Sequence, residues 1–112
     1  MSKISAHVLD TALGKPAREL ALRIDLLEEG TFRNLGSDRT NADGRVGDLL
    51  HGRALEPGTY RVVFDTEPYL RATGQNVFYP YVEIVFVVAS ASEHYHIPLL
   101  LSPYGYSTYR GS

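Results

Sequence analysis

The hydropathy of this chain follows a pattern of period two, which turn-forming residues interrupt at short intervals and which few folds can accommodate. Apolar and polar residues alternate over several short stretches, and Gly, Pro, Asn and Asp stand between them. Successive side chains of a strand point to opposite sides, so this alternation is typical of half-buried strands. In residues 19–28 the apolar positions that share one face are Leu20, Leu22, Ile24 and Leu26. The pattern predicts an all-β chain.

Seven or eight short strands and one helix are expected. The strands are predicted at residues 4–10, 19–28, 31–36, 59–64, 81–89, 94–101 and 106–110, with a short ambiguous segment at 49–55 and a loop at 37–47. Thr66 as N-cap, Pro68 in the first turn and Gly74 at the end predict a helix over residues 67–73. Residues 81–89 carry apolar side chains at successive positions, as in a strand covered on both faces. The best architecture is a two-sheet antiparallel β-sandwich.

Composition limits the class of protein. A chain of 112 residues with 44% hydrophobic and 21% charged residues is typical of one soluble domain, here residues 1–112. Eleven Lys and Arg balance thirteen Asp and Glu, which argues against nucleic acid or a membrane surface as partner. The absence of cysteine excludes disulfides and thiolate chemistry. Without a signal peptide or a long apolar run, a cytoplasmic location is expected.

Two single residues are candidates for chemistry. His7 lies on the face of the first strand opposite Ile4 and Val8, and the simplest interpretation is a partly exposed strand histidine. Arg45 follows the turn-forming residues 41–44, and the simplest interpretation is a solvated arginine. Its guanidinium group nevertheless offers a planar fork that suits an imide or ureide edge.

A pair of histidines near the C-terminus is a third candidate. His94 and His96 would share one strand face, roughly 6–7 Å apart. Two such imidazoles can chelate a metal ion, with His7 or His51 as the third ligand. Alternatively, one of them is a general base, since histidine titrates near neutral pH. The spacing does not choose between these alternatives.

The last four residues are unusual for a chain end. Chain ends commonly fray, yet Tyr109, Arg110, Gly111 and Ser112 carry an aromatic and a charged side chain to the final positions. The segment is either packed against the protein or a simple edge strand.

Three segments of the chain resemble the 5-hydroxyisourate hydrolases, the transthyretin-like enzymes of urate breakdown. The segments are residues 4–17, 41–45 and 94–112, and the likeness extends over the whole chain, including residues 64–66 and 78–82. The closing Tyr-Arg-Gly-Ser is the most specific tag of that family. The resemblance implies an eight-stranded sandwich with one short helix, which agrees with the count from periodicity.

The resemblance also implies a site and an assembly. Family members are homotetramers, dimers of dimers, with active sites in the cleft between two dimers, and they use neither metal nor cofactor. The implied catalytic residues are His7, Arg45, His96 and Ser112, and the implied substrate-binding residues are His7, Arg45, Tyr109, Arg110 and Gly111.

The implied reaction opens the ring of 5-hydroxyisourate at its N1–C6 amide and gives 2-oxo-4-hydroxy-4-carboxy-5-ureidoimidazoline. His7 and His96 would activate water and deliver a proton, in an undecided order, and Arg45 would hold the imide oxygens. Transthyretin, the hormone carrier of the same fold, lacks the two histidines, the arginine and the terminal tag. The alternatives are a carrier of a hydrophobic ligand, a zinc hydrolase and a purely structural sandwich.

Overall fold

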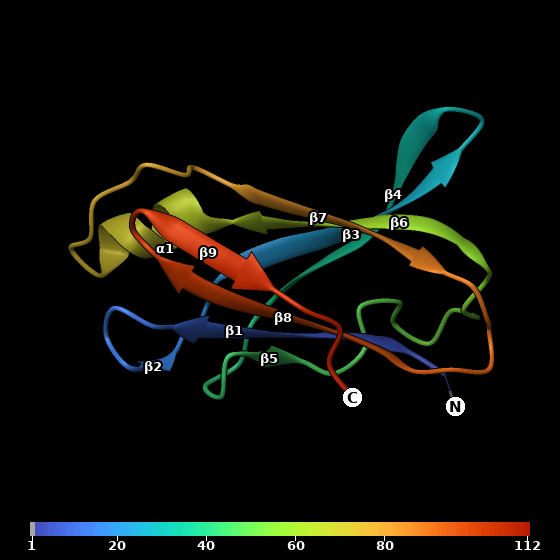
Figure 1. Cartoon of the computed structure of the whole chain (residues 1–112), viewed down its shortest axis with the longest axis horizontal. Helices are drawn as coiled ribbons and strands as arrows, with labels where there is room; N and C mark the ends of the chain where they lie inside the picture. The colour runs from blue at the N-terminus through green and yellow to red at the C-terminus, as the bar shows by residue number, and fades with distance from the viewer. Residues whose placement is uncertain (1) are drawn as a thin grey trace.

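The computed structural model describes residues 2–112. These residues fold into two packed β-sheets and one short helix (Figure 1). The first sheet contains β1 (Ile4–Asp10), β2 (Lys15–Pro16), β5 (Arg45–Val46), β8 (Tyr95–Ser102) and β9 (Gly105–Thr108). The second contains β3 (Ala21–Glu28), β4 (Thr31–Arg39), β6 (Gly58–Asp65) and β7 (Val82–Val88). The helix is α1 (Thr66–Ala72), at the end of the sandwich away from both termini (Figure 1). The predicted β-sandwich is confirmed.

The first sheet corrects one detail of the prediction. Its strand order is β2-β1-β8-β9, with β5 also paired to β1. β1 and β8 run parallel, so that Ser5 lies opposite His96, whereas the other pairs are antiparallel. Most of the chain lies between β1 and β8, and a long connection can bring two strands together in either direction.

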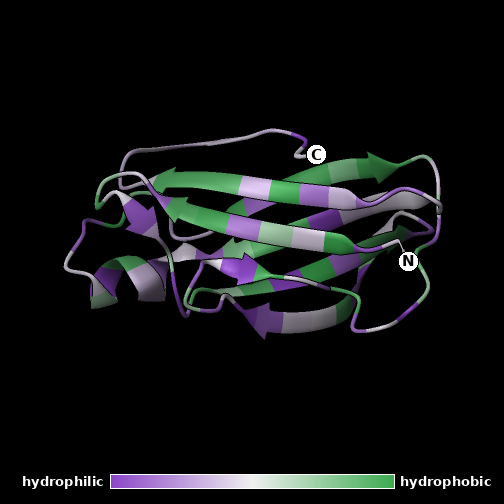
Figure 2. Ribbon diagram, turned by 90° about the horizontal axis from the view of Figure 1, so that it is seen from below, coloured by the Kyte–Doolittle hydropathy of each residue, from purple (hydrophilic) through white to green (hydrophobic). Residues whose placement is uncertain are grey.

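The second sheet has the order β4-β3-β6-β7, and the core lies between it and the first sheet. The predicted alternation is confirmed, and the apolar bands that it places along the strands are visible in Figure 2. Buried side chains come from both sheets: Ile4, Ala6, Val8, Leu22, Ile24, Leu26, Tyr60, Val62, Phe64, Ile97, Leu99 and Leu101. This core holds β1 and β8 rigidly, which fixes the side chains on their outer faces.

The helix forms one residue earlier than predicted, and Thr66 does not cap it. Asp65 occupies the N-cap position without a side-chain hydrogen bond to the helix. The Thr66 hydroxyl instead donates to the Tyr79 carbonyl oxygen at 2.6 Å. The helix is tied to the first sheet by the Tyr69 hydroxyl, which donates to a buried carboxylate oxygen of Asp10 at 2.6 Å.

Several strand boundaries differ from the predicted ones. β4 continues to Arg39, and β5 forms inside the predicted loop 37–47. The ambiguous segment 49–55 forms no strand, although it buries Leu49, Leu50 and Leu55. β9 ends at Thr108, before the predicted end at residue 110. Local propensity defines strand interiors better than strand ends, which tertiary contacts decide.

β7 lies at a sheet edge and is not covered on both faces in the single chain. Ile84 and Phe86 pack against the core, whereas Val85 and Val87 on the other face are 55% and 68% exposed. The apolar run therefore leaves a hydrophobic strip on the molecular surface. No helix among residues 2–112 has the length and apolar character needed to cross a membrane.

Candidate active site

Three strands of the first sheet bring together the histidine and arginine candidates. His7 on β1 lies opposite Arg45 on β5, and Ser5 on β1 lies opposite His96 on β8. The ring centroids of His7 and His96 are 6.3 Å apart. Because Ile4 and Val8 point into the core, these polar side chains occupy the outer face of the sheet. Residues far apart in sequence thus form one cluster.

A tight turn holds Arg45 in register with β1. The side-chain oxygen of Asn41 accepts hydrogen bonds from the amides of Asp43 and Arg45, at 2.9 and 3.0 Å. Gly44 has φ of 74°, and a Cβ there would lie 2.4 Å from the Val8 carbonyl oxygen. Glycine is therefore required for β5 to approach β1 this closely. The turn residues 41–44, inside the predicted loop, thus position the backbone of Arg45 beside His7.

The two site histidines are held in their neutral forms. Burial, followed by the charge of Arg45, lowers the pKa of His7 from its ordinary value of 6.5, against an opposing effect of Asp43. Burial, Arg45, His7 and His94, in that order, lower the pKa of His96. Both imidazoles are therefore unprotonated near neutral pH, so each can accept a proton from water.

The terminal segment lies against β8 beside His96. The amide of Gly111 donates to the carbonyl oxygen of His96 at 3.0 Å, which forms an isolated bridge after the end of β9. A Cβ at position 111 would lie 2.4 Å from Cδ2 of His96. Only glycine fits without displacing the ring or the segment, so Gly111 allows the chain to pass directly beside His96.

Tyr109 and Arg110 both line one groove, which His7, Arg45 and His96 do not line. The Arg110 guanidinium lies 4.5 Å from the Tyr95 ring centroid and 3.0 Å from a Glu93 carboxylate oxygen. Tyr109 is 60% exposed and lines a groove of about 220 Å³ between β7 and the β8–β9 pair, together with Val85. The single chain therefore does not bring these two side chains to His7, and their assigned roles stay predictions.

Ser5 is a site residue that sequence reasoning missed. Its hydroxyl lies 2.8 Å from Nδ1 of His96 and 3.0 Å from Nε2 of His94. Alternation places Ser5 on the same face as His7, but only the parallel pairing of β1 with β8 brings it to the two histidines. His94 and His96 do share a face, as predicted. Among residues 2–112, no three side chains of His, Cys, Asp or Glu are grouped to hold a metal ion.

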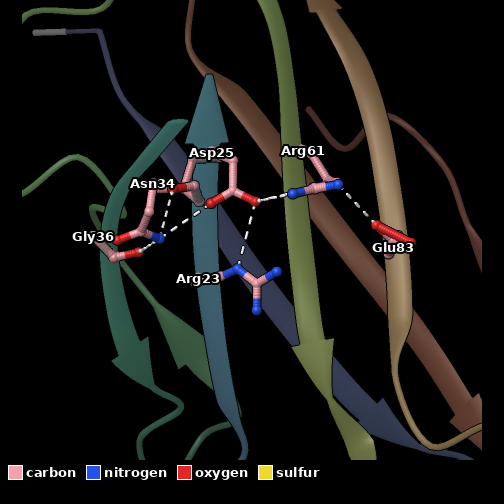
Figure 3. Close-up of polar contacts among 7 residues, drawn as sticks. Arg23, Asp25, Asn34, Gly36, Arg61 and Glu83 are labelled. Atoms are coloured by element: carbon pink, nitrogen blue, oxygen red, sulfur yellow. Dashed lines mark hydrogen bonds and ion pairs between the residues drawn. The ribbon is translucent and has the colours of Figure 1, made fainter. Parts of the chain in front are cut away.

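A second polar cluster lies on the outer face of the other sheet (Figure 3). The carboxylate of Asp25, only 2% exposed, accepts hydrogen bonds from Nε and Nη2 of Arg61 at 3.0 and 2.8 Å. Asn34 donates to it at 3.1 Å, and Arg23 lies at 3.5 Å. Arg61 also donates to Glu83, so the charges are mutually paired across β3, β6 and β7. The cluster joins neighbouring strands, and because its charged groups are paired with one another, few of them are available to bind a ligand.

The fold and the histidine cluster together define a class of protein: a transthyretin-like β-sandwich with two imidazoles and a guanidinium group on the outer face of one sheet. The family model described as HIUase/Transthyretin family matches residues 4–111, and the chain belongs to this family.

Relatives of known name differ in function while sharing the fold. The 5-hydroxyisourate hydrolase of Mus musculus is 49% identical, over 99% of this chain and 96% of its own length. The structure of Klebsiella pneumoniae 5-hydroxyisourate hydrolase is 33% identical, covers 100% of both chains and superposes with a TM-score of 0.86. Transthyretin from Sparus aurata is 30% identical and superposes with a TM-score of 0.91, over 99% of this chain and 97% of its own. The backbone alone therefore does not separate enzyme from transthyretin, and the site residues must.

Proposed function

We propose that this chain is a hydrolase that opens 5-hydroxyisourate at the N1–C6 amide to give 2-oxo-4-hydroxy-4-carboxy-5-ureidoimidazoline, a step in urate breakdown. The observation that carries the proposal is the convergence of His7, Arg45 and His96 on one sheet face. Relatives that are 40–50% identical over nearly the whole chain bear the name of this activity. An enzyme needs ionisable groups at its site, and these three residues supply them.

The neutral histidines supply the acid–base chemistry. One imidazole of the His7 and His96 pair takes a proton from water as the water attacks the C6 carbonyl carbon. The C6–N1 bond then breaks, and the departing nitrogen leaves as a delocalised anion or takes a proton from a histidine. The lowered pKa values support the base role, because a protonated ring could not accept the first proton.

The cationic and terminal groups would bind the substrate. Arg45 is fixed at its base by the Asn41 turn and exposed at its tip, so it can hold the imide oxygens and stabilise the developing negative charge. Gly111 allows the terminal segment to pass close to His96, which supports a role for Ser112 at the same site. Tyr109 and Arg110 would reach a substrate only from a neighbouring subunit.

We infer that four chains assemble as a dimer of dimers, with the sites between dimers. His7, Arg45 and His96 lie on an open sheet face, whereas small-molecule sites are concave and bury most of their ligand. A second subunit facing this sheet would close the site. The exposed Val85 and Val87 on the β7 edge, beside the groove that Tyr109 lines, offer an apolar surface for a further subunit contact.

The similarity to transthyretin makes a carrier function the second candidate. One of the structures similar to this chain is sea bream transthyretin in complex with thyroxine, at a TM-score of 0.88. A carrier of an apolar ligand should line its cleft with aliphatic side chains, whereas this face presents two imidazoles and a guanidinium group. The polar site favours the hydrolase.

The test is a spectroscopic assay on the purified protein. The absorbance of freshly made 5-hydroxyisourate is followed with and without the protein, since the compound also decays spontaneously. The proposal predicts a rate of loss that rises in proportion to protein concentration and is unchanged by a strong chelator. A rate equal to the spontaneous one would exclude the hydrolase, and a rate abolished by the chelator would show that a metal is needed.

A further inference from the structure

We propose that Ser5 is a positioning residue that fixes the proton on the ring of His96 and couples that ring to His94. The inference rests on the proposed function, since it assigns a task to a residue that supports a catalytic histidine. Ser5 comes from β1, whereas His96 lies in β8 and His94 directly precedes that strand, so the contact crosses the parallel strand pair.

The geometry directs one particular nitrogen of His96 toward the Ser5 hydroxyl. Oγ of Ser5 lies 2.8 Å from Nδ1 of His96, within ordinary hydrogen-bond distance. The two nitrogens of an imidazole point in nearly opposite directions, so Nε2 faces away from Ser5 and is left for the substrate or water. Ser5 is only 8% exposed, and bulk water competes little for this hydrogen bond.

The hydroxyl has one proton and two histidine partners. Nε2 of His94 lies 3.0 Å from the same oxygen, so Ser5 can donate to one ring and must accept from the other. If it donates to His94, then Nδ1 of His96 carries a proton and Nε2 of His96 has a free lone pair, which is the form a general base needs. If it donates to His96, then Nε2 of His96 carries the proton and acts only as a donor.

The position of the proton on the His94 ring selects between these two arrangements. When Nε2 of His94 carries a proton, it donates to the Ser5 oxygen, which turns the Ser5 proton toward Nδ1 of His96 and leaves Nε2 of His96 without a free lone pair. Arg45 and His7 also face His96, and both disfavour a second proton on its ring. The hydroxyl therefore couples the hydrogen bond of the exposed His94 to the tautomer of the partly buried His96.

The experiment compares Ser5→Ala with Ser5→Thr, which keeps the hydroxyl, and with Ser37→Ala, which removes an exposed hydroxyl from β4 in the other sheet. Nitrogen-15 chemical shifts of the histidine rings report which nitrogen carries the proton, with or without activity. Wild type and Ser5→Thr are expected to hold His96 in one dominant tautomer. Ser5→Ala is expected to populate both tautomers.

Kinetics give the second readout. We expect Ser5→Ala to lower kcat on the order of tenfold with little change in KM, as for the loss of one hydrogen bond, and to shift the acidic side of its pH profile. Ser5→Thr and Ser37→Ala should retain both kcat and the profile. Unchanged His96 tautomers and an unchanged pH profile in Ser5→Ala would overturn the inference. An inactive wild type would instead refute the proposed function, and the ring shifts would still test the role of Ser5.

Discussion

The pKa values of two imidazoles, those of His7 and His96, depend on their burial and on the positive charge beside them. His7 and His96 are partly buried, lie 6.3 Å apart and share the positive neighbour Arg45. Burial and the charge of Arg45 disfavour the protonated form of both rings, and His7 also disfavours it for His96, so both pKa values lie below 6.5. Activity that depends on a neutral base should therefore be retained at neutral pH and fall as the pH drops below that value.

Replacing Arg45 tests this electrostatic account. Arg45→Gln removes the positive charge, so the pKa values of His7 and His96 should both rise toward 6.5, because the protonated rings become less unfavourable. Titration of the ring signals by nuclear magnetic resonance measures this directly. Arg39→Gln, a change to an exposed arginine on β4, serves as the control. Unchanged histidine pKa values in Arg45→Gln would show that Arg45 does not influence the pair.

At the scale of strands, the two outer sheet faces are stabilised differently. The first sheet leaves His7 and His96 partly exposed on its outer face, whereas the second buries Asp25 under paired arginines (Figure 3). Arg61 is the main partner of this carboxylate and is 22% exposed. A buried charge without its partner is costly to the folded state.

Arg61→Ala should therefore lower the free energy of unfolding by about 3 kcal/mol, the effect typical of breaking a buried ion pair from one side. Chemical denaturation measures the change. The matched control is Arg71→Ala, which removes an exposed ion pair with Glu67 on α1 and should cost less than about 1 kcal/mol. Equal effects of the two substitutions would show that the Asp25 cluster does not join the strands as described.

The terminal segment allows a test at the same scale. A side chain at position 111 would collide with the His96 ring, so Gly111→Ala should displace the ring or the chain end and lower activity about tenfold or more. The melting temperature should change little, since the segment lies beyond β9. In Gly105→Ala the added Cβ meets its neighbour at an ordinary 3.7 Å, so this variant should keep full activity. Full activity in Gly111→Ala would contradict the placement of the chain end.

The sequence predicted strand interiors better than contacts between strands. Period two correctly placed Leu22, Ile24 and Leu26 in the core, because burial on one face is a local pattern. Ser5 was missed, since its partners depend on a parallel pairing that no local signal encodes. The covered faces predicted for residues 81–89 are not found in one chain, because apolar residues at an edge need a second molecule to cover them.

For the whole molecule, the open site and the apolar β7 edge both favour assembly with further subunits. A site on a sheet face cannot exclude water until another subunit covers it. The exposed Val85 and Val87 lie on an edge strand, where unpaired backbone groups also favour association.

Sedimentation should therefore find a species with the mass of four chains. Val87→Lys places a charge on the apolar strip and should produce smaller species with reduced activity. Thr31→Lys changes an exposed residue of β4, the opposite edge of the same sheet, and should leave the assembly intact. A fully active monomer would contradict the proposal that subunits complete the site.

The decisive experiment compares the initial rate of 5-hydroxyisourate loss in His96→Asn with that in wild type. Asparagine keeps a polar side chain but cannot exchange a proton near neutral pH, so the rate should fall by at least about a hundredfold. An unchanged circular dichroism spectrum and melting temperature would show that the fold is intact. A His96→Asn protein with near-normal turnover would contradict the claim that this imidazole drives the reaction.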